Sequence, residues 1–367
     1  MARETLVALG LMSGTSLDGL DLCLVEFNAD DLADFSILAA ETRPYEADWN
    51  ERLKRAFAST LVGGEELKEL DQAYGELLGK QSSRFIKERS KGRKVDLIAS
   101  HGHTIFHKPD QGVTVQIGSG ERIHQQAKIP VVCNFRVQDV SLGGQGAPLV
   151  PVGDRLLFTS YHVCLNLGGI ANLSFEKRDK LDDESARVAW DICPVNLVLN
   201  HFAAKLGLAF DDGGQMARKG KIHRGLYDRL NQLAFYQKAP PKSLGYEFVV
   251  ESVFPLVEEF QVADVHDILR TLTEHIAYQI AQTLNATGKS NVLVTGGGAY
   301  NAYLIERLQE HSNLDVCVPA DPMIVEYKEA LIFALLGVLK VQGRNNCLSS
   351  VTGAQRDHCS GDCWGFL

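Results

Sequence analysis

The chain has 367 residues, of which 45% are hydrophobic and 23% are charged, and its formal net charge is −9. This length suits two domains better than one core, and the composition is typical of a globular protein. The acidic balance disfavours nucleic acid and anionic membrane surfaces as partners, because both would require a basic face.

The start of the chain does not resemble a targeting segment. Arg3 is followed at once by Glu4, and the apolar stretch after them is short and soon interrupted. The sequence also holds no window of about 18 uninterrupted apolar residues, the length that a membrane helix needs. We therefore expect a cytoplasmic protein without a membrane span.

The 8 cysteines do not follow the spacing of a disulfide or zinc framework. Cys23, Cys133, Cys164 and Cys317 each lie in an apolar, strand-like run, where cysteine behaves as a small buried hydrophobe. The segment DHCSGDC near the C-terminus is the only cluster of metal-ligand type, and its spacing and lack of a second pair disfavour zinc. We expect the thiols to be reduced.

The first half of the chain predicts an α/β layer. Apolar runs near 5–12, 20–27 and 35–43 predict three strands, the first two antiparallel because only a short glycine turn joins them. Leucine and tyrosine at helical spacing predict a helix over 65–89. Further strands and a helix from about 120 follow, a mixture that indicates an α/β fold. The stretch 142–151, rich in glycine and proline, is predicted to cross into a second unit.

The second half repeats this pattern. Residues 162–177 again predict strand, glycine turn and strand, and a third strand and a helix come next. Helices are predicted near 221–236, 247–260 and 265–286. The segment NVLVTGGGAYN then leads from a buried strand through three glycines into a helix, and a short strand and a long helix over about 326–342 complete the pattern.

The glycine turn at 13–19, SGTSLDG, has two interpretations. An ordinary hairpin turn explains it, since glycine and aspartate supply positive φ angles and local hydrogen bonds. Alternatively, its N–H groups bind a phosphate and Asp18 or Asp21 faces a metal ion. Neither a GxGxxG turn at the first strand-to-helix junction nor a GxxxxGK[ST] loop is present, which disfavours the Rossmann and P-loop mechanisms.

Three glycine turns together favour the second interpretation. Two hairpins facing each other across a cleft could hold a triphosphate, and a third turn at the start of a helix could accept the nucleoside. This arrangement resembles the actin, hexokinase and Hsp70 superfamily. More closely, the chain resembles the anhydro-N-acetylmuramic acid kinase family in a series of motifs that occur in the family's order: GLMSGTSLDGLD, SHGHTIFH, NFRVQDVSLGGQGAPLVP, LNLGGIANLS, LVTGGGAYN, EALIFALLG and SVTGA.

The resemblance implies a fold and an activity. The fold would be α/β, a two-domain actin/hexokinase/Hsp70-like (ribonuclease H-like) structure with its active site in the interdomain cleft. The N-terminal domain would comprise 1–155 plus 338–367, and the C-terminal domain 156–337. The family uses ATP, with Mg²⁺, and water to convert 1,6-anhydro-N-acetylmuramic acid into N-acetylmuramic acid 6-phosphate during cell-wall turnover, and it suggests a homodimer.

The proposed base is Asp191, in AWDICPVN. Opening the anhydro ring needs a carboxylate that activates water on the face opposite O6, as in an inverting glycosidase. The alternative is a helix N-cap, because a helix is predicted to start at the following proline. The family pattern is close to DTGPGN, and this chain keeps Asp, Pro and Asn but replaces Thr and both Gly, which leaves the shape of the sugar pocket open.

Three further residues are expected at the sugar by resemblance, two of them with a rival. Glu329 would be a second contact to sugar or water, with Glu326 as the competing candidate and a dipole-favoured surface position as the alternative. Arg136 would bind the lactyl carboxylate in two bonds, or else be a surface charge at a strand end. His101 would hydrogen-bond the sugar, or be a satisfied buried histidine, and His103 is its rival.

The three turns supply the expected nucleotide contacts. In the first, Asp18 and Asp21 would also serve Mg²⁺, directly or through water. The phosphate-binding residues of this turn are Ser13, Gly14, Thr15, Ser16, Leu17, Asp18, Gly19, Leu20 and Asp21. The second turn would meet the triphosphate with Gly168, Gly169 and Asn172, and the third would meet the nucleoside with Gly296, Gly297, Gly298 and Asn301.

Three rival functions stay open at this point. A chaperone-like ATPase shares the superfamily fold, but a separate peptide-binding domain is not evident in the sequence. A kinase of a different sugar is compatible with the altered DICPVN segment. A catalytically dead nucleotide-binding protein predicts loss of Asp18 and Asp191, and both are present.

Overall fold

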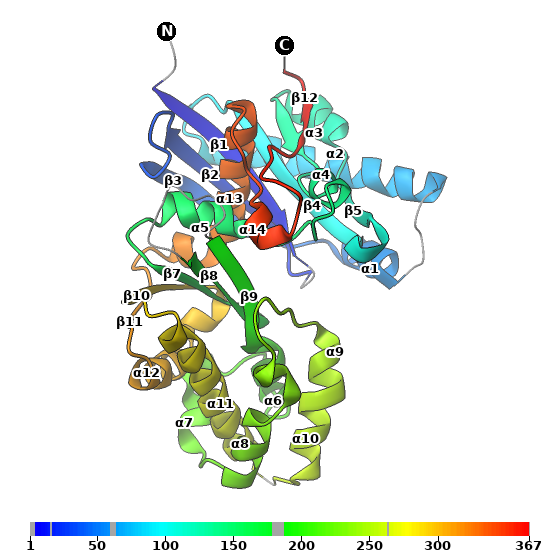
Figure 1. Cartoon of the computed structure of the whole chain (residues 1–367). Helices are drawn as coiled ribbons and strands as arrows, with labels where there is room; N and C mark the ends of the chain where they lie inside the picture. Colours follow the sequence, from blue (N-terminus) through cyan, green and yellow to red (C-terminus); the bar gives the residue numbers. More distant parts are fainter. Residues whose placement is uncertain (1–3, 15–16, 59–63, 178–186, 263, 367) are drawn as a thin grey trace. The chain divides into compact units, whose positions relative to one another are not determined.

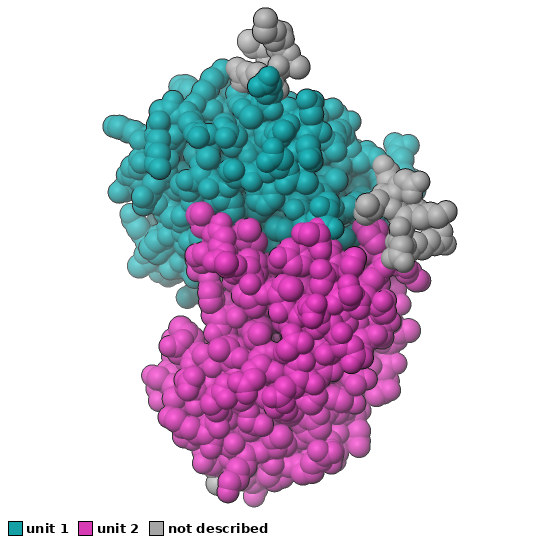
Figure 2. All heavy atoms as spheres, turned by 90° about the vertical axis from the view of Figure 1, so that its left-hand side faces the viewer, with its two compact units in different colours: residues 1–159, 182–187, 327–367 teal, residues 160–181, 188–326 magenta. Residues whose placement is uncertain are grey.

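The computed structural model describes residues 4–14, 17–58, 64–177, 187–262 and 264–366 (Figure 1). The chain divides into two compact units, unit 1 with residues 1–159, 182–187 and 327–367, and unit 2 with residues 160–181 and 188–326 (Figure 2). The predicted first boundary, 155/156, lies close to the one between the units. The predicted second boundary, 337/338, and the observed one both fall within helix α13 (Pro322–Val341).

Unit 1 contains a mixed sheet in the order β12-β6-β4-β1-β2-β3, with β5 paired to β4. β1, β2 and β3 are antiparallel neighbours, while β4 runs parallel to both β1 and β6. The three strands predicted at the start of the chain are confirmed to within one residue. The strands are β1 (Thr5–Ser13), β2 (Leu20–Asn28), β3 (Phe35–Arg43), β4 (Leu97–Lys108), β5 (Val113–Ile117), β6 (Val131–Cys133) and β12 (Asp362–Trp364).

Helices cover both faces of this sheet because β1 is apolar on both sides. Leu9 and Leu11 of β1 pack into a core that includes Tyr74 of α2. On the opposite face, a Cβ on Gly10 would overlap the carbonyl oxygen of Ala330, so α13 packs directly on the backbone of β1. The helices of unit 1 are α1 (Ala47–Ala58), α2 (Glu65–Arg89), α3 (Gly120–Ala127), α4 (Val137–Ser141), α5 (Val150–Leu157), α13 and α14 (Ser349–Thr352), with a 3-10 turn η1 (Pro109–Gln111).

Unit 2 repeats the strand order of unit 1. Its sheet has the order β11-β10-β7-β8-β9, and β7 is antiparallel to β8 and parallel to β10. Two sheets with the same order, each combined with helices, confirm the predicted α/β, two-domain fold class. The predicted position of the active site in an interdomain cleft stays a prediction. The strands are β7 (Val163–Leu167), β8 (Ile170–Glu176), β9 (Arg187–Pro194), β10 (Asn291–Thr295) and β11 (Asp315–Cys317).

The helices of unit 2 follow the predicted segments, with two interruptions. The helix predicted at 221–236 ends at Asn231, and the one predicted at 247–260 contains a π-helical turn just before Pro255, whose missing N–H breaks the α-helical ladder. The elements are α6 (Asn196–Ala204), η3 (Asp212–Gly214), α7 (Gln215–Lys219), α8 (Arg224–Asn231), η4 (Ala234–Gln237), α9 (Tyr246–Phe248), η5 (Val249–Val253), α10 (Phe254–Glu259), α11 (Val265–Ala286), η6 (Gly297–Tyr300) and α12 (Ala302–His311).

The stretch 142–151 does not cross between the units. It lies inside unit 1, where the main-chain N–H of Gln145 donates to the carbonyl of Thr352 at 2.8 Å. The prediction was wrong because glycine and proline also mark a loop that folds back on its own unit. Among the described residues, no helix has the length and apolarity that a membrane crossing requires.

Candidate active site

The first predicted phosphate turn joins β1 to β2 in unit 1. Ser13 ends β1 and is buried, and its hydroxyl lies 2.8 Å from Nδ1 of His103 and accepts a 2.6 Å hydrogen bond from Tyr45. Parallel pairing of β1 with β4 sets Ser13 opposite His103. The Ser13 side chain is therefore engaged inside unit 1, and Thr15 and Ser16 lie outside the described residues.

The rest of this turn presents two carboxylates. Asp18 is exposed, and Asp21, at the start of β2, accepts a 2.6 Å hydrogen bond from Oγ1 of Thr42. Leu17 holds a φ angle of +59°, uncommon for a residue with a side chain, and its N–H donates to the carbonyl of Gly14 at 3.3 Å. Gly19 and Leu20 are buried under this turn. The turn thus exposes hard oxygen atoms of the kind that Mg²⁺ binds.

Arg136 and His101 meet in unit 1. Nε of Arg136 donates to Nε2 of His101 at 3.0 Å, and Nη1 donates to the carbonyl of Gly146 at 2.6 Å. Burial and the neighbouring guanidinium hold the pKa of His101 well below its usual value, so the imidazole is neutral and accepts at Nε2. Arg136 is partly buried and donates two hydrogen bonds within unit 1, which argues against the alternative of a surface charge.

Glu329 lies on α13, two residues after a kink at Tyr327. Burial raises the pKa of its carboxyl, while the charges of Lys328 and Arg136 oppose that rise. Glu329 therefore belongs to unit 1 with Arg136, although the predicted bounds placed it in the C-terminal domain. Its rival Glu326 belongs to unit 2, is exposed, and accepts a 2.7 Å hydrogen bond from the hydroxyl of Tyr300.

The second predicted phosphate turn lies between β7 and β8 in unit 2. The carbonyl of Gly169 accepts a 2.8 Å hydrogen bond from the N–H of Val195, and the carbonyl of Gly168 accepts a 3.3 Å bond from the N–H of Asn196. These donors are the first residues of α6 and its N-cap. The turn is therefore fixed by main-chain bonds, and Asn172 follows it within β8.

The third turn lies beside the second. β7 and β10 are parallel neighbours, and a Cβ on Gly296 would come within 2.9 Å of the carbonyl oxygen of Leu167 at the end of β7. Gly296 also has a φ angle of +83°, which favours glycine. Gly297 and Gly298 begin η6, and Asn301 caps α12 by accepting from its main chain at 3.0 Å. The side-chain oxygen of Asn301 is therefore engaged within unit 2.

Asp191 lies within β9, not at a helix end. Its Oδ2 accepts a 2.8 Å hydrogen bond from the N–H of Leu244, and its own N–H donates to the carbonyl of Lys242 at 3.0 Å. The N-cap of α6 is Val195, so the alternative role of Asp191 as that cap is wrong. Burial raises the pKa of the Asp191 carboxyl, which makes it a stronger base than an exposed aspartate.

Comparison with known proteins agrees with these motifs. The family model described as anhydro-N-acetylmuramic acid kinase matches residues 6–364. The chain belongs to this family. A protein named anhydro-N-acetylmuramic acid kinase from Synechococcus elongatus is 36% identical, over 96% of this chain and 98% of its own, and one of the same name from Synechocystis sp. is 34% identical, over 96% and 97%.

Solved structures are more distant. Plasmodium falciparum glycerol kinase with ADP has a TM-score of 0.48 and 8% identity, with 91% of this chain and 90% of that chain covered. Component A of the Acidaminococcus fermentans (R)-2-hydroxyglutaryl-CoA dehydratase has a TM-score of 0.46 and 13% identity, covering 92% and 99%. Likeness at this level says nothing about activity.

The departure of this chain from the family's DTGPGN pattern is explained by packing. Ile192, Cys193 and Val195 are at most 2% exposed and belong to the apolar core of unit 2. These larger side chains therefore fill the apolar core beneath the strand and are not exposed on the surface of unit 2.

Sequence reasoning missed the groups that hold Asp191 and Ser13 in place. Lys242 and Leu244, which bond to Asp191, lie in an irregular segment about fifty residues later, and no local pattern marks them. Tyr45, which bonds to Ser13, follows a proline and is read in sequence only as part of a loop. No local sequence signal marks Tyr45 as a partner of Ser13, because the two residues meet only in the folded chain.

Proposed function

We propose that the chain is an ATP-dependent sugar kinase that hydrolyses the 1,6-anhydro ring of 1,6-anhydro-N-acetylmuramic acid and phosphorylates O6. The products are N-acetylmuramic acid 6-phosphate and ADP, a step in peptidoglycan recycling and amino-sugar catabolism. The observation that carries this proposal is the family match over residues 6–364. The presence of Asp191 and Glu329 in partly buried positions that raise the pKa of each carboxyl supports it.

Asp191 is the proposed base. Water attacks the anomeric carbon, the bond from that carbon to O6 breaks, and O6 bonds to the γ-phosphorus as ADP leaves. The proton of the water passes to the Asp191 carboxylate. The bond from Leu244 orients this carboxylate, and the raised pKa strengthens it as a proton acceptor.

Arg136 and Glu329 are the proposed sugar contacts in unit 1. A guanidinium suits the lactyl carboxylate because it offers several N–H donors in a planar fork. Burial raises the pKa of the Glu329 carboxyl, the charges of Lys328 and Arg136 oppose that rise, and Glu329 would accept from a sugar hydroxyl or from the water. His101 holds Arg136 in this proposal, and its own contact with the sugar stays a prediction.

The glycine turns are the proposed ATP contacts. The first would bind phosphate oxygens through its main chain, Gly168 and Gly169 would contribute from the second, and the segment 296–298 with Asn301 would contact the nucleoside. The exposed carboxylate of Asp18 and the partly exposed one of Asp21 fit Mg²⁺, which supplies charge neutralisation on the phosphates when bound. We also propose that the protein is a homodimer and that it is located in the cytoplasm. Light scattering, which gives the mass of the assembly in solution, tests the homodimer.

One assay tests the reaction. Protein, Mg·ATP and 1,6-anhydro-N-acetylmuramic acid are incubated, and the products are identified by mass spectrometry. The proposal expects equal amounts of ADP and N-acetylmuramic acid 6-phosphate. ATP turnover that is independent of the sugar would instead support the chaperone-like ATPase, and a 6-phosphate formed only from another sugar would support a different sugar kinase.

A further inference from the structure

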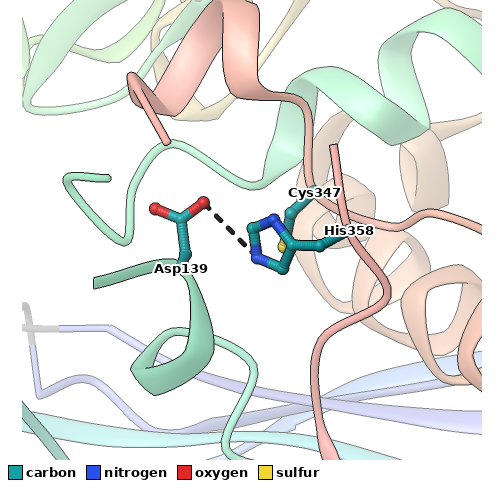
Figure 3. A group of neighbouring side chains, drawn as sticks. All are labelled: Asp139, Cys347 and His358. Carbon is teal, nitrogen blue, oxygen red and sulfur yellow. Dashed lines mark ion pairs between the residues drawn. The ribbon is translucent and has the colours of Figure 1, made fainter. Parts of the chain in front are cut away.

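A buried polar cluster in unit 1 has no role in the reaction proposed above. Asp139 on α4 points toward Cys347 and His358, which lie opposite each other in an isolated β-bridge (Figure 3). All three residues are at most 5% exposed, and their carboxylate, thiol and imidazole atoms lie within 4.8 Å of one another. Buried groups of these kinds need partners, so the cluster requires an explanation.

Asp139 is the centre of the cluster. Its Oδ2 accepts from the N–H of Gly146 at 2.7 Å, and its Oδ1 accepts from the hydroxyl of Thr352 at 2.7 Å. Nε2 of His358 lies 3.6 Å from the same Oδ1, and the main-chain carbonyl of Asp139 accepts from Gly144 at 2.9 Å. One aspartate therefore joins α4 to the loop that follows it and to the C-terminal segment.

Carboxylate, thiolate and imidazole are also zinc ligands, but the bonding favours a hydrogen-bonded hub. Both oxygens of Asp139 already accept short hydrogen bonds within the chain. Burial raises the pKa of the Cys347 thiol, so in the metal-free chain this side chain is a neutral member of the cluster. Among the described residues the group has three members, whereas closed structural zinc sites have four.

The loop after α4 is shaped around this carboxylate. A Cβ on Gly144 would overlap Oδ2 of Asp139, so only glycine permits the approach. Gly146 has a φ angle of +67°, in the left-handed region that favours glycine. The bond from Gln145 to the carbonyl of Thr352 fixes the loop from its other side. The segment GGQG is therefore a loop that encloses one carboxylate.

This loop reaches the guanidinium of Arg136. Gly146 gives its N–H to Asp139 and its carbonyl to Nη1 of Arg136, while Nε of Arg136 donates to His101. Two guanidinium nitrogens are thereby held, and within the described part of the chain we find no partner for Nη2. Holding Nε and Nη1 determines the direction of the remaining N–H groups, because the guanidinium is planar and rigid.

We propose that Asp139 is a positioning residue for Arg136. By holding Gly146, Asp139 sets the direction in which the guanidinium of Arg136 meets the carboxylate of the substrate. The inference rests on the proposed function, in which Arg136 binds the lactyl carboxylate. Asp139 itself touches no reacting atom. Its loss therefore weakens recognition of an acidic sugar and spares recognition of the same anhydro sugar without a lactyl group.

The test compares those two sugars, 1,6-anhydro-N-acetylmuramic acid and 1,6-anhydro-N-acetylglucosamine, the second as a substrate or as a competitive inhibitor. Asp139→Ala raises KM for the acidic sugar by about tenfold or more and keeps kcat within about threefold of wild type. The KM or inhibition constant of the neutral sugar stays unchanged. Asp139→Asn, which retains an acceptor for Gly146, restores most of the loss. Asp357→Asn is the matched control, because among the described residues the hydrogen-bond donors to Asp357 are the main chain and hydroxyl of Ser349, in the same C-terminal segment. This variant should leave the KM for both sugars unchanged.

A double-variant cycle separates positioning from general damage. Arg136→Ala abolishes the preference for the acidic sugar, and adding Asp139→Ala causes no further loss, because a positioning residue acts only through its partner. Additive losses in the double variant, or equal losses on the two sugars, would overturn the proposal. If Asp139→Ala does not fold, Thr352→Val can replace it, because this change removes the hydroxyl that donates to Asp139. KM for the acidic sugar should then rise by a smaller factor, again without a change for the neutral sugar.

Two outcomes distinguish failure of this proposal from failure of the proposed function. A wild-type protein that does not phosphorylate the acidic sugar refutes the kinase, and with it the premise of the hub. An active kinase whose preference survives Asp139→Ala refutes the hub alone. One equivalent of zinc in the purified protein, lost in Cys347→Ser and retained in Cys363→Ser, would also overturn the hub and assign a metal site.

Discussion

The two hairpin turns occupy the same position in sheets of the same strand order, yet different atoms hold them. In unit 1 the turn is anchored by a side chain, Ser13, which bonds to Tyr45 and His103. In unit 2 the turn is anchored by main-chain carbonyls of Gly168 and Gly169. A shared topology therefore determines where a turn lies, and the local sequence determines which of its groups are available for a ligand.

This difference assigns separate tasks to the two units. The first turn exposes carboxylates suited to a metal ion. The second is bonded to the first residues of α6, which directly follow the strand that carries Asp191. The geometry of the proposed base and that of the second turn are therefore coupled through one short segment of unit 2.

The largest effect is expected at the base in unit 2. Asp191→Asn should lower kcat by about a thousandfold or more, because the amide cannot accept the proton of the attacking water. ATP affinity should change little. Steady-state kinetics and ATP titration measure the two quantities, with Asp212→Asn, an exposed aspartate of the same unit, as the control. A fully active Asp191→Asn variant would remove Asp191 as the base.

The next effect separates the two candidate glutamates. Glu329→Gln should lower kcat/KM by about a hundredfold, since Glu329 is partly buried beside Arg136. Glu326→Gln should stay within about twofold of wild type, because Glu326 is exposed and bonded to Tyr300. The reverse order of these two effects would transfer the role to Glu326.

The pH dependence should follow the buried carboxyls. Burial raises the pKa of Asp191 above its ordinary 3.8, so the base becomes protonated, and kcat/KM falls, as the pH drops through that raised value. The decrease should approach tenfold per pH unit. His101 and His103 should not contribute near pH 6.5, because the pKa of His101 is held well below its ordinary value and that of His103 is about 4. Equal activity from pH 7 down to pH 4 would contradict this account.

Glycine substitutions compare the second and third turns. Gly296→Ala should destabilise unit 2 by about 2 kcal/mol or more, because the φ angle is positive and the new Cβ meets the main chain of Leu167. Gly168→Ala should change stability by less than about 0.5 kcal/mol, since the nearest atom would lie 3.4 Å away. Urea unfolding measures both, and equal losses would show that packing does not distinguish these turns.

A modest effect, on stability more than on kinetics, is expected at Ser13. Ser13→Ala should lower the free energy of unfolding by about 1–2 kcal/mol, because it leaves Tyr45 and His103 without their shared partner. KM for ATP should change by less than about threefold. Unchanged stability together with a strongly raised KM would instead show that the Ser13 hydroxyl contacts phosphate, as the sequence motif suggests.

Local patterns predicted the elements well, because a strand or helix is specified by the spacing of its apolar residues. The strands of the first hairpin and the helices α2 and α11 were predicted nearly residue for residue. Interruptions were harder to predict. The π-helical turn lies just before Pro255, which the sequence shows, but a proline alone does not give the type of turn. The helix α8 packs against α11, and its early end depends on such tertiary contacts, which a one-dimensional pattern does not contain.

The site divides in the same way. Motifs located Asp191 and Arg136, since each lies in a short segment with a family signature. Their environments could not be read from sequence: Leu244 reaches Asp191 and Gly146 reaches Arg136 only through tertiary structure. The stretch 142–151 was interpreted as a crossing between units because its glycines could not be assigned from sequence to Asp139, the carboxylate that they surround.

The central claim is that water opens the ring and that O6, still on the sugar, receives the phosphoryl group. A single turnover in ¹⁸O-labelled water, quenched before the anomeric hydroxyl exchanges with solvent, tests it directly by mass spectrometry of product fragments. The account predicts one ¹⁸O at the anomeric carbon and none in the phosphate ester. Label in inorganic phosphate with an unlabelled, intact anhydro sugar would contradict it, because the protein would then be hydrolysing ATP alone.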